Sequence, residues 1–388
     1  MTGRTTPSPI RLDIPPLYIP YATTPHPDYD ILTARIGTWL DDLGPRLIPH
    51  QRSMLTDYNL PAMACLALPT TSGSDRFALA AQNAILHGYF DMLVLEADPV
   101  AGDLMLASDA IARTLQAMDG SVPQRPAGES AEEPPFLAMW TDLAHRVQAC
   151  LGPLLSARWV NAHRHGWLGH LRHTAYSLAG AQPTLDHYVL MRSDSAGGPL
   201  IPLLVEMTRE PDLSTPLLTV PELRALSQAA TLLIGWDNDI FSYAREHALG
   251  RPPHPDEAPR RAPVNLVDLL LREHHCTLPE AFDQAVRLRD QVMCLFVRLS
   301  EKYLPTARDD VRTYVADLGQ MIRGYAEYLL TPHTTYHRKT DSIEPDQDPH
   351  ALSYTFGHGG LTAERSEPTN HQPLPYPSIR WWWDLLDT

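Results

Sequence analysis

Hydrophobic residues recur along most of the chain at the spacing of an α-helix. Over residues 28–42, Ile31, Ile36, Trp39 and Leu40 share a helical pattern, and the "LGP" that follows ends it. Prolines and glycines gather between such segments. We find no alternating run bounded by a two-residue hairpin turn, so we expect no strands. Further helices are predicted over 75–96, 100–118, 134–160, 162–180, 184–195, 199–208, 221–249, 264–272, 278–302 and 306–330.

This pattern predicts an all-α protein built as one large helical bundle with short loops. Residues 28–338 would form the bundle, after a Pro-rich segment at 1–27 and before a polar, Pro/His-rich tail at 339–388. An acidic, Gly/Pro-rich stretch near 119–135 is expected to be a loop. The tail ends in "SIRWWWDLLDT". We expect its tryptophans to dock on the bundle or on a partner, because exposing all of them would leave a large apolar patch.

Composition narrows the range of partners and compartments. A formal net charge of -15 argues against nucleic acid, because binding to phosphates needs a basic face. Four cysteines without a CxxC pair indicate a reducing compartment. The N-terminal residues lack the apolar core of a signal peptide, and no run approaches the ~20 apolar residues of a membrane span. We therefore expect a soluble, cytoplasmic protein with no nucleic-acid partner and no membrane span.

The stretch "WDNDIFSYAREH", residues 236–247, carries the strongest chemical signal. Asn238, Ser242 and Glu246 recur at steps of four, which places three oxygen donors on one face of a helix. An amide, a hydroxyl and a carboxylate suit a hard cation such as Mg²⁺, which completes its shell with water and substrate phosphates. Zinc would require His or Cys. Any one of these residues alone would indicate a cap or a solvated side chain, but the triplet points to a metal site.

The segment "NDIFSYARE" resembles the NDxxSxxxE metal triad of class I terpene synthases, the bacterial cyclases of prenyl diphosphates. The resemblance implies a helical bundle around a central apolar active-site cavity. It also implies that Asn238, Ser242 and Glu246 bind one of three Mg²⁺ ions that hold the substrate diphosphate, with Mn²⁺ as a substitute. Arg245 stands where the family commonly has a lysine, so a positive charge that binds diphosphate is retained.

Other segments extend the resemblance from about residue 25 to residue 336. "PTLDHYVLMR" is similar to the family helix that ends in a diphosphate-sensing arginine, here Arg192, 46 residues before Asn238. "VNLVDLLLREHHCTLPEAFD" is similar to a later family segment. Tyr336 stands where the family has a diphosphate-binding tyrosine, whereas Thr335 replaces the neighbouring arginine.

The family's aspartate-rich motif has one degenerate match, "GYFDMLVLEAD". Asp91 takes its first position, Met92 stands where the second aspartate is expected, and Glu96 is the final acid. Asp98 is a further option for that last role. We predict Asp91 and Glu96 as metal ligands. The loss of one carboxylate at Met92 leaves open a lower metal affinity or turnover.

The chemistry that the resemblance implies is ionisation of the substrate and cyclisation of its carbocation. Metal ions and Arg192 would stabilise the departing diphosphate. An apolar cavity would shield the cation from water, and aromatic faces would attract it by ~0.5–2 kcal/mol each. The candidates for these faces are Tyr89, Phe90, Trp236 and Tyr328, although each could equally belong to the core.

We therefore predict an enzyme that converts farnesyl or geranylgeranyl diphosphate to a terpene hydrocarbon or alcohol. Two alternatives stay open: a catalytically impaired prenyl-diphosphate-binding paralogue, favoured by Met92 and Thr335, and a class I cyclase acting on a bicyclic diphosphate. A chain-elongating prenyltransferase is disfavoured because it needs two aspartate-rich motifs. The expected partner is a small prenyl diphosphate, and the resemblance is compatible with a homodimer.

Overall fold

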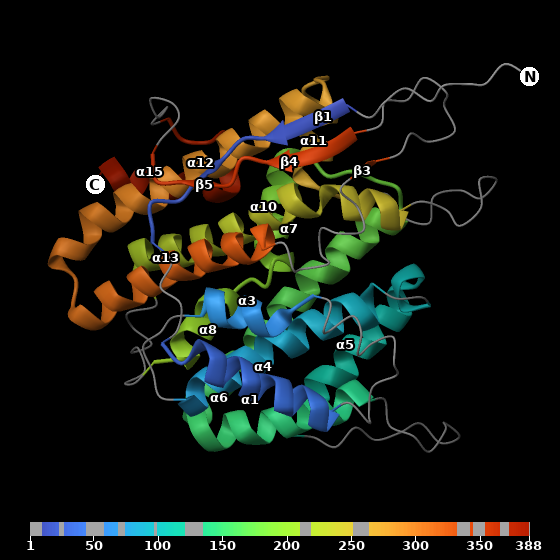
Figure 1. Ribbon diagram of the computed structural model, residues 1–388, viewed down its shortest axis with the longest axis vertical. Helices are drawn as coiled ribbons and strands as arrows, with labels where there is room; N and C mark the ends of the chain where they lie inside the picture. The colour runs from blue at the N-terminus through green and yellow to red at the C-terminus, as the bar shows by residue number, and fades with distance from the viewer. Residues whose placement is uncertain are drawn as a thin grey trace, which may run out of the picture.

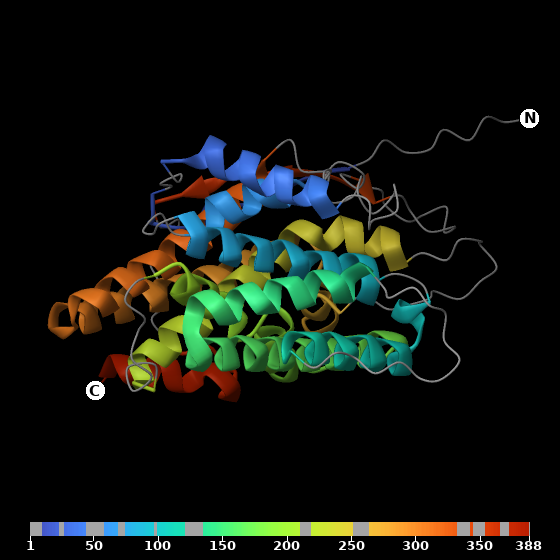
Figure 2. The same ribbon diagram turned by 90° about the horizontal axis from the view of Figure 1, so that it is seen from below.

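Helices make up most of the structure, a computed structural model, and the all-α prediction is confirmed (Figure 1). Figure 2 shows the long helices running roughly along one direction. The structure describes residues 10–22, 27–43, 58–68, 74–96, 99–120, 135–209, 219–250, 264–331, 342–343, 354–364 and 372–387. The helices are α1 (Tyr29–Leu43), α3 (Leu60–Ala67), α4 (Ser74–Phe90), α5 (Leu104–Met118), α6 (Pro135–Leu178), α7 (Leu185–Ser195), α8 (Leu200–Met207), α10 (Pro221–Gly250), α11 (Leu266–Glu273), α12 (Leu278–Tyr303), α13 (Asp309–Leu330) and α15 (Pro377–Asp387).

Side-chain caps explain where several of these helices begin. Asp103 accepts hydrogen bonds from the first backbone amides of α5, and Thr184 does the same for α7. Asn265 caps α11 through the amide of Val267, at 2.9 Å. At α12, Thr277 and Glu280 form a reciprocal capping box in front of a proline in the first turn. The helix predicted over 278–302 therefore begins where expected, at Leu278.

Helix α6 corrects the sequence prediction at one point. We expected two helices that separate at residue 161, but the chain is helical there and changes direction earlier, at Gly152. Gly152 has φ 72° and ψ 170°, a conformation that favours glycine, and Pro153 follows it without an amide to donate. None of the described helices, including the long α6, is both long enough and apolar enough to cross a membrane.

The expectation of no strands was wrong at the two ends of the chain. Strand β1 (Ile10–Ile14) pairs in parallel with β4 (Tyr354–His358), and β2 (Leu17–Tyr18) pairs in parallel with β5 (Leu361–Thr362). Strand β3 (Ser342–Ile343) pairs with β4 in the antiparallel sense. A parallel partner more than 300 residues away leaves no hairpin signal in the sequence.

Helix α15 packs the end of the tail onto the bundle. It contacts α12, α7 and α10. Trp382 and Trp383 are buried, whereas Trp381 lies under the guanidinium of Arg224, 4.6 Å from the ring centre to the guanidinium carbon. The tryptophans therefore dock on the bundle, which was one of the two expected outcomes. Helices α3 and α15 were not predicted.

Candidate active site

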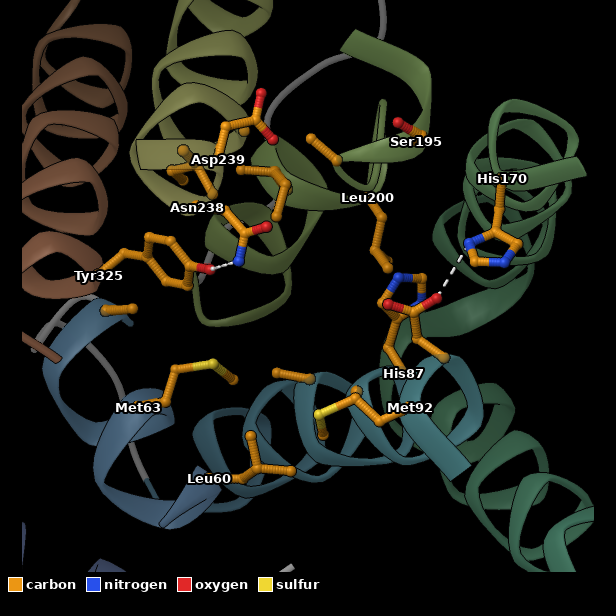
Figure 3. A pocket seen from close by; sticks show the side chains of 18 of the residues that line it. Leu60, Met63, His87, Met92, His170, Ser195, Leu200, Asn238, Asp239 and Tyr325 are labelled. Atoms are coloured by element: carbon orange, nitrogen blue, oxygen red, sulfur yellow. Dashed lines mark hydrogen bonds and ion pairs between the residues drawn. The ribbon is translucent and has the colours of Figure 1, made fainter. Parts of the chain in front are cut away.

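A cavity of about 310 Å³ lies inside the bundle, lined from α3, α4, α6, α7, α8, α10 and α13. Figure 3 shows Asn238 and His170 on opposite sides of it, with Leu60 and Met63 along another wall. The polar part of its lining includes Asp91, Glu96, Arg192, Asn238, Arg245 and Glu246. Most of the remaining lining is apolar or small. The cavity therefore combines a charged wall with an apolar chamber, as a ligand with both characters requires.

Helix α10 brings the predicted triad to this cavity. Asn238 and Glu246 line it directly, while Ser242 is fully buried and reaches it through Glu246. The Ser242 hydroxyl donates to Glu246 Oε1 at 2.5 Å, and Asn265 Nδ2 donates to Glu246 Oε2 at 3.0 Å. Burial raises the pKa of Glu246, and these two hydrogen bonds oppose that rise. The carboxylate is thus aimed by its neighbours before any ligand binds.

Arg192 meets the triad at its first member. Its Nη2 lies 2.8 Å from Asn238 Oδ1 and 3.0 Å from the backbone oxygen of Gly235. This close packing of Arg192 against α10 depends on Gly235, because a Cβ at that position would lie 2.9 Å from Ala196 Cβ and 3.4 Å from Arg192 Cγ. Arg192 Nε is buried and has no hydrogen-bond partner among the described residues. No group of the described chain therefore uses that donor.

Asp239 anchors this arginine, a role that we did not predict. Its Oδ1 lies 2.9 Å from Arg192 Nη2, and only 3% of the Asp239 side chain is exposed. The Tyr188 hydroxyl and the backbone amide of Leu266 both donate to its Oδ2. Asn238 is held in turn by Tyr325, because its Nδ2 donates to the tyrosine oxygen at 3.1 Å.

Asp91 lies on the facing wall, where α4 continues into the π-helical turn η2 (Asp91–Leu95). A π-turn at a functional site is common. The carboxylate Oδ1 of Asp91 lies 3.0 Å from His170 Nδ1, and 39% of the side chain is exposed. Burial would raise its pKa, but His170, assisted by His87 and Arg245, outweighs burial and lowers the pKa of Asp91 to about 2. Met92 lines the cavity beside it.

Glu96 and Arg245 join the two walls. Arg245 Nη2 from α10 lies 2.9 Å from Glu96 Oε2 at the end of η2, although the two residues are 149 positions apart. The Arg245 guanidinium also lies over the ring of Tyr58, 5.8 Å from its centre. A predicted metal ligand and a predicted diphosphate-binding residue are therefore paired with each other. Both line the cavity, so an incoming anion and cation have access to them.

The predicted aromatic residues divide into two groups. Tyr328 lines the cavity, and its hydroxyl donates to the backbone oxygen of Tyr58 at 2.6 Å. Tyr89, Phe90 and Trp236 are buried but lie outside its lining. The spacing of Met321, Tyr325 and Tyr328 at steps of four and three is the sequence signal that marks the α13 face in the cavity. On the α6 wall, His170, His173, Thr174 and Ser177 follow the same kind of spacing.

Several predicted residues lie outside the described part of the chain. These are Tyr336 and its neighbour Thr335, together with Asp98. Their roles stay predictions, as do the domain boundaries at residues 28 and 338.

The donor set at the cavity fits a hard cation. Within the described ranges, no group of three or more His, Cys, Asp or Glu side chains has an arrangement that would hold a metal ion. The triad consists of an amide, a hydroxyl and a carboxylate, and the facing wall adds Asp91. Oxygen donors of this kind match the preference of Mg²⁺, which also keeps waters and binds substrate phosphates.

A buried arginine with an unpaired donor, oxygen donors on two walls and an apolar chamber fit a ligand with an apolar chain and a polyanionic group. The family model described as terpene synthase family 2, C-terminal metal binding, matches residues 89–294. The chain belongs to this family. It is a terpene synthase, and its metal-binding domain makes a divalent metal ion its cofactor.

Similar proteins cover nearly the whole chain. Bonnadiene synthase of Allokutzneria albata is 28% identical in an alignment 390 positions long, which covers 96% of this chain and 98% of that protein. The (+)-(1(10)E,4E,6S,7R)-germacradien-6-ol synthase of Streptomyces pratensis is 26% identical, over 96% of this chain and 97% of its own. Among solved structures, the SVS_A2 protein from ancestral sequence reconstruction matches with a TM-score of 0.75 at 24% identity, over 96% of this chain and 99% of that one. At this identity the structural match shows the fold alone.

Proposed function

We propose that the enzyme ionises and cyclises a linear prenyl diphosphate, farnesyl or geranylgeranyl diphosphate, and releases diphosphate together with a terpene hydrocarbon or alcohol. The observation that carries the proposal is the cluster of Arg192, Asn238 and Glu246 on one wall of a cavity that has Asp91 on its facing wall and mostly apolar residues elsewhere. An arginine grips phosphate oxygens through several donors at once. The apolar remainder suits an isoprenoid chain.

The proposed cofactor is a set of three Mg²⁺ ions, with Mn²⁺ as a substitute. Asn238, Ser242 and Glu246 would hold metal from α10, and Asp91 with Glu96 would hold it from the facing wall. When bound, the metal supplies Lewis-acid neutralisation of the diphosphate charge.

The side chains of this chain then divide the remaining work. Arg192 Nε, which is buried without a partner, would donate to a diphosphate oxygen, and Asp239 would keep the guanidinium in place. Arg245 would exchange Glu96 for the diphosphate, which frees the Glu96 carboxylate for metal. Positive groups fixed where negative charge develops on the leaving group stabilise the transition state. Tyr336 would add a further donor.

The apolar lining would protect the carbocation from water until it cyclises. Tyr58, Tyr325 and Tyr328 belong to the cavity lining, and their rings would take the role expected of Tyr89, Phe90 and Trp236. A ring face attracts a cation by about 0.5–2 kcal/mol.

A second candidate function is prenyl-diphosphate binding without turnover. The observation that favours it is Met92, which lines the cavity where the family pattern has an acid. A further alternative is a cyclase that acts on a bicyclic diphosphate made by another enzyme. The cavity lining is equally compatible with such a substrate. The homodimer and the cytoplasmic location stay predictions.

Incubation with Mg²⁺ and geranyl, farnesyl or geranylgeranyl diphosphate, followed by extraction and mass spectrometry, tests the proposal. We expect a cyclic product from at least one of the two longer substrates. Asn238→Ala should abolish it with an unchanged helical circular dichroism spectrum, while Asn161→Ala, a control at an exposed asparagine on α6, should keep it. Binding of all three substrates without product would favour the second candidate.

A further inference from the structure

Strands β1 and β2, near the start of the described chain, pair with β4 and β5, which precede α15, behind helix α10. Besides the β1–β4 and β2–β5 pairs, the amide of Gly359 donates to Ile14 O at 2.8 Å, and that of Leu17 donates to Gly360 O at 3.0 Å. Figure 1 shows β1 and β4 side by side over the region of α10, α11 and α12. We call residues 10–19 together with 354–362 the terminal clasp.

The clasp contacts α10 on both sides of Ser242. Helix geometry places Phe241 and Tyr243 about 100° to either side of Ser242. The ring of Phe241 stacks on His358, with centres 4.7 Å apart and an angle of 22°, and the ring of Tyr243 meets Phe356 edge-on at 6.4 Å. Phe356 and His358 are two residues apart on β4 and therefore share one face of that strand. Strand β4 thus crosses α10 behind the triad.

A buried ion pair ties the same helix to the N-terminal part of the clasp. Arg289 on α12 is fully buried, and its Nε lies 2.7 Å from Asp237 Oδ1, next to the first triad residue. Arg289 Nη1 donates to the backbone oxygen of Tyr18 at 2.5 Å, and the amide of Tyr18 donates to Asp290 Oδ1 at 3.1 Å. Both backbone polar groups of Tyr18 are therefore held by charged side chains of α12.

We propose that the terminal clasp positions the metal-binding stretch of α10, residues 237–246, and that Phe356 and His358 act on it as positioning residues. The proposal rests on the proposed function, since it concerns how firmly the triad holds its metal. The front of this stretch carries polar groups that face a cavity, whereas its flanks carry Phe241 and Tyr243. Ligands keep a productive geometry only when packed side chains behind them fix their orientation.

The Phe241–His358 stack offers the mildest test, because His358 is an exposed residue and its loss leaves no buried charge behind. His358→Ala and Phe356→Ala remove the two rings, and His358→Phe restores a ring at the stack. Arg11→Ala is the matched control: it lies on β1 in the same sheet, and its side chain is 73% exposed beside Asp13.

Hydrogen exchange and calorimetry, with the melting temperature as a check on stability, separate positioning from overall stability. In metal-free protein, hydrogen exchange at the amides of residues 237–246 should be faster in both alanine variants than in the wild type. The melting temperature of each variant should stay close to that of the wild type. Calorimetry with inorganic diphosphate and Mg²⁺ should need on the order of tenfold more Mg²⁺ for half-saturation. His358→Phe and Arg11→Ala should match the wild type in both measurements.

Faster exchange with an unchanged Mg²⁺ requirement would overturn the proposal, because the clasp would then support the helix without aiming its ligands. Variants that match the wild type in both measurements would overturn it as well. A wild-type protein that binds no diphosphate in the presence of Mg²⁺ would overturn the proposed function and this proposal together. The wild-type titration therefore distinguishes the two failures before any variant is examined.

Discussion

Replacing Gly235 with alanine should impair catalysis while leaving the bundle folded. In a helix interior, alanine is favoured over glycine by about 1 kcal/mol, so the substitution gains that much from backbone propensity. The new Cβ would lie 2.9 Å from Ala196 Cβ, closer than real Cβ contacts, and 3.4–3.5 Å from Cγ and Nε of Arg192. Overpacking of this kind costs about 1–3 kcal/mol. We therefore expect a net loss of unfolding free energy, and a displaced Arg192.

For catalysis, the displacement of Arg192 matters more than the loss of unfolding free energy. Arg192 Nη2 now contacts both Gly235 O and Asn238 Oδ1, so a shift of a few tenths of an ångström disturbs both contacts. Misplacement of a positioning group by about 1 Å costs on the order of 100-fold in rate, and a smaller shift should cost proportionately less. We expect kcat/KM for the accepted prenyl diphosphate to fall by roughly three- to tenfold on that scale.

Gly37→Ala provides the matched control. Gly37 also lies inside a helix, α1, but a Cβ there meets nothing within 4 Å. This variant should be stabilised by up to about 1 kcal/mol and keep full activity. Urea unfolding and steady-state kinetics on both variants would settle the comparison. If Gly235→Ala gained as much stability as Gly37→Ala and kept wild-type kcat/KM, the argument that Arg192 needs this glycine would be refuted.

Three further outcomes are expected. Met92→Asp should lower the Mg²⁺ concentration for half-maximal turnover, because it adds a carboxylate to the wall that carries Asp91; an unchanged Mg²⁺ titration would contradict that placement. Burial alone would raise the pKa of Asp91, but His170 and its neighbours lower it from 3.8 to about 2. The ionised carboxylate therefore stabilises the folded state above about pH 4, and this contribution is lost as the pH falls toward 2. In urea unfolding, the unfolding free energy of Asp91→Asn should depend less on pH between about 2 and 4 than that of the wild type. An equal pH dependence in the two proteins would contradict the pairing of Asp91 with His170. Arg289→Met should destabilise the protein by about 3–5 kcal/mol because it strands Asp237 in the core, and Arg289→Met combined with Asp237→Leu should recover most of that loss in thermal unfolding.

The sequence could predict those site residues whose relation is set within one helix. Asn238, Ser242 and Glu246 share a face because the helix repeats every 3.6 residues, whatever surrounds it. In the structure Asn238 and Glu246 line the same cavity, and Ser242 reaches it through its hydrogen bond to Glu246. Arg192 was grouped with the triad because the family usually has its arginine about 46 residues before the asparagine. In the structure Arg192 contacts Asn238 directly.

Contacts between helices were beyond the reach of local pattern. The sequence around Asn265 does not predict that its side-chain amide donates to Glu246, because that hydrogen bond depends on how α11 packs against α10. The same holds for His170 beside Asp91. Strand β1 did carry an alternating pattern, with Leu12 and Ile14 buried, but its partner lies at the other end of the chain and the pattern was too short to stand alone.

The acids on the two walls of the cavity differ in what must move before they can bind a ligand, and this difference suggests an order of events. On the α10 wall, Glu246 is held by two neighbours and Asn238 by Arg192 and Tyr325. On the facing wall, Asp91 is paired with His170, and Glu96 is paired with Arg245 from α10. Groups that are already oriented lose less conformational freedom on binding. We therefore expect diphosphate and metal to engage α10 first, because only the removal of Arg245 from Glu96 releases the second acid of the facing wall.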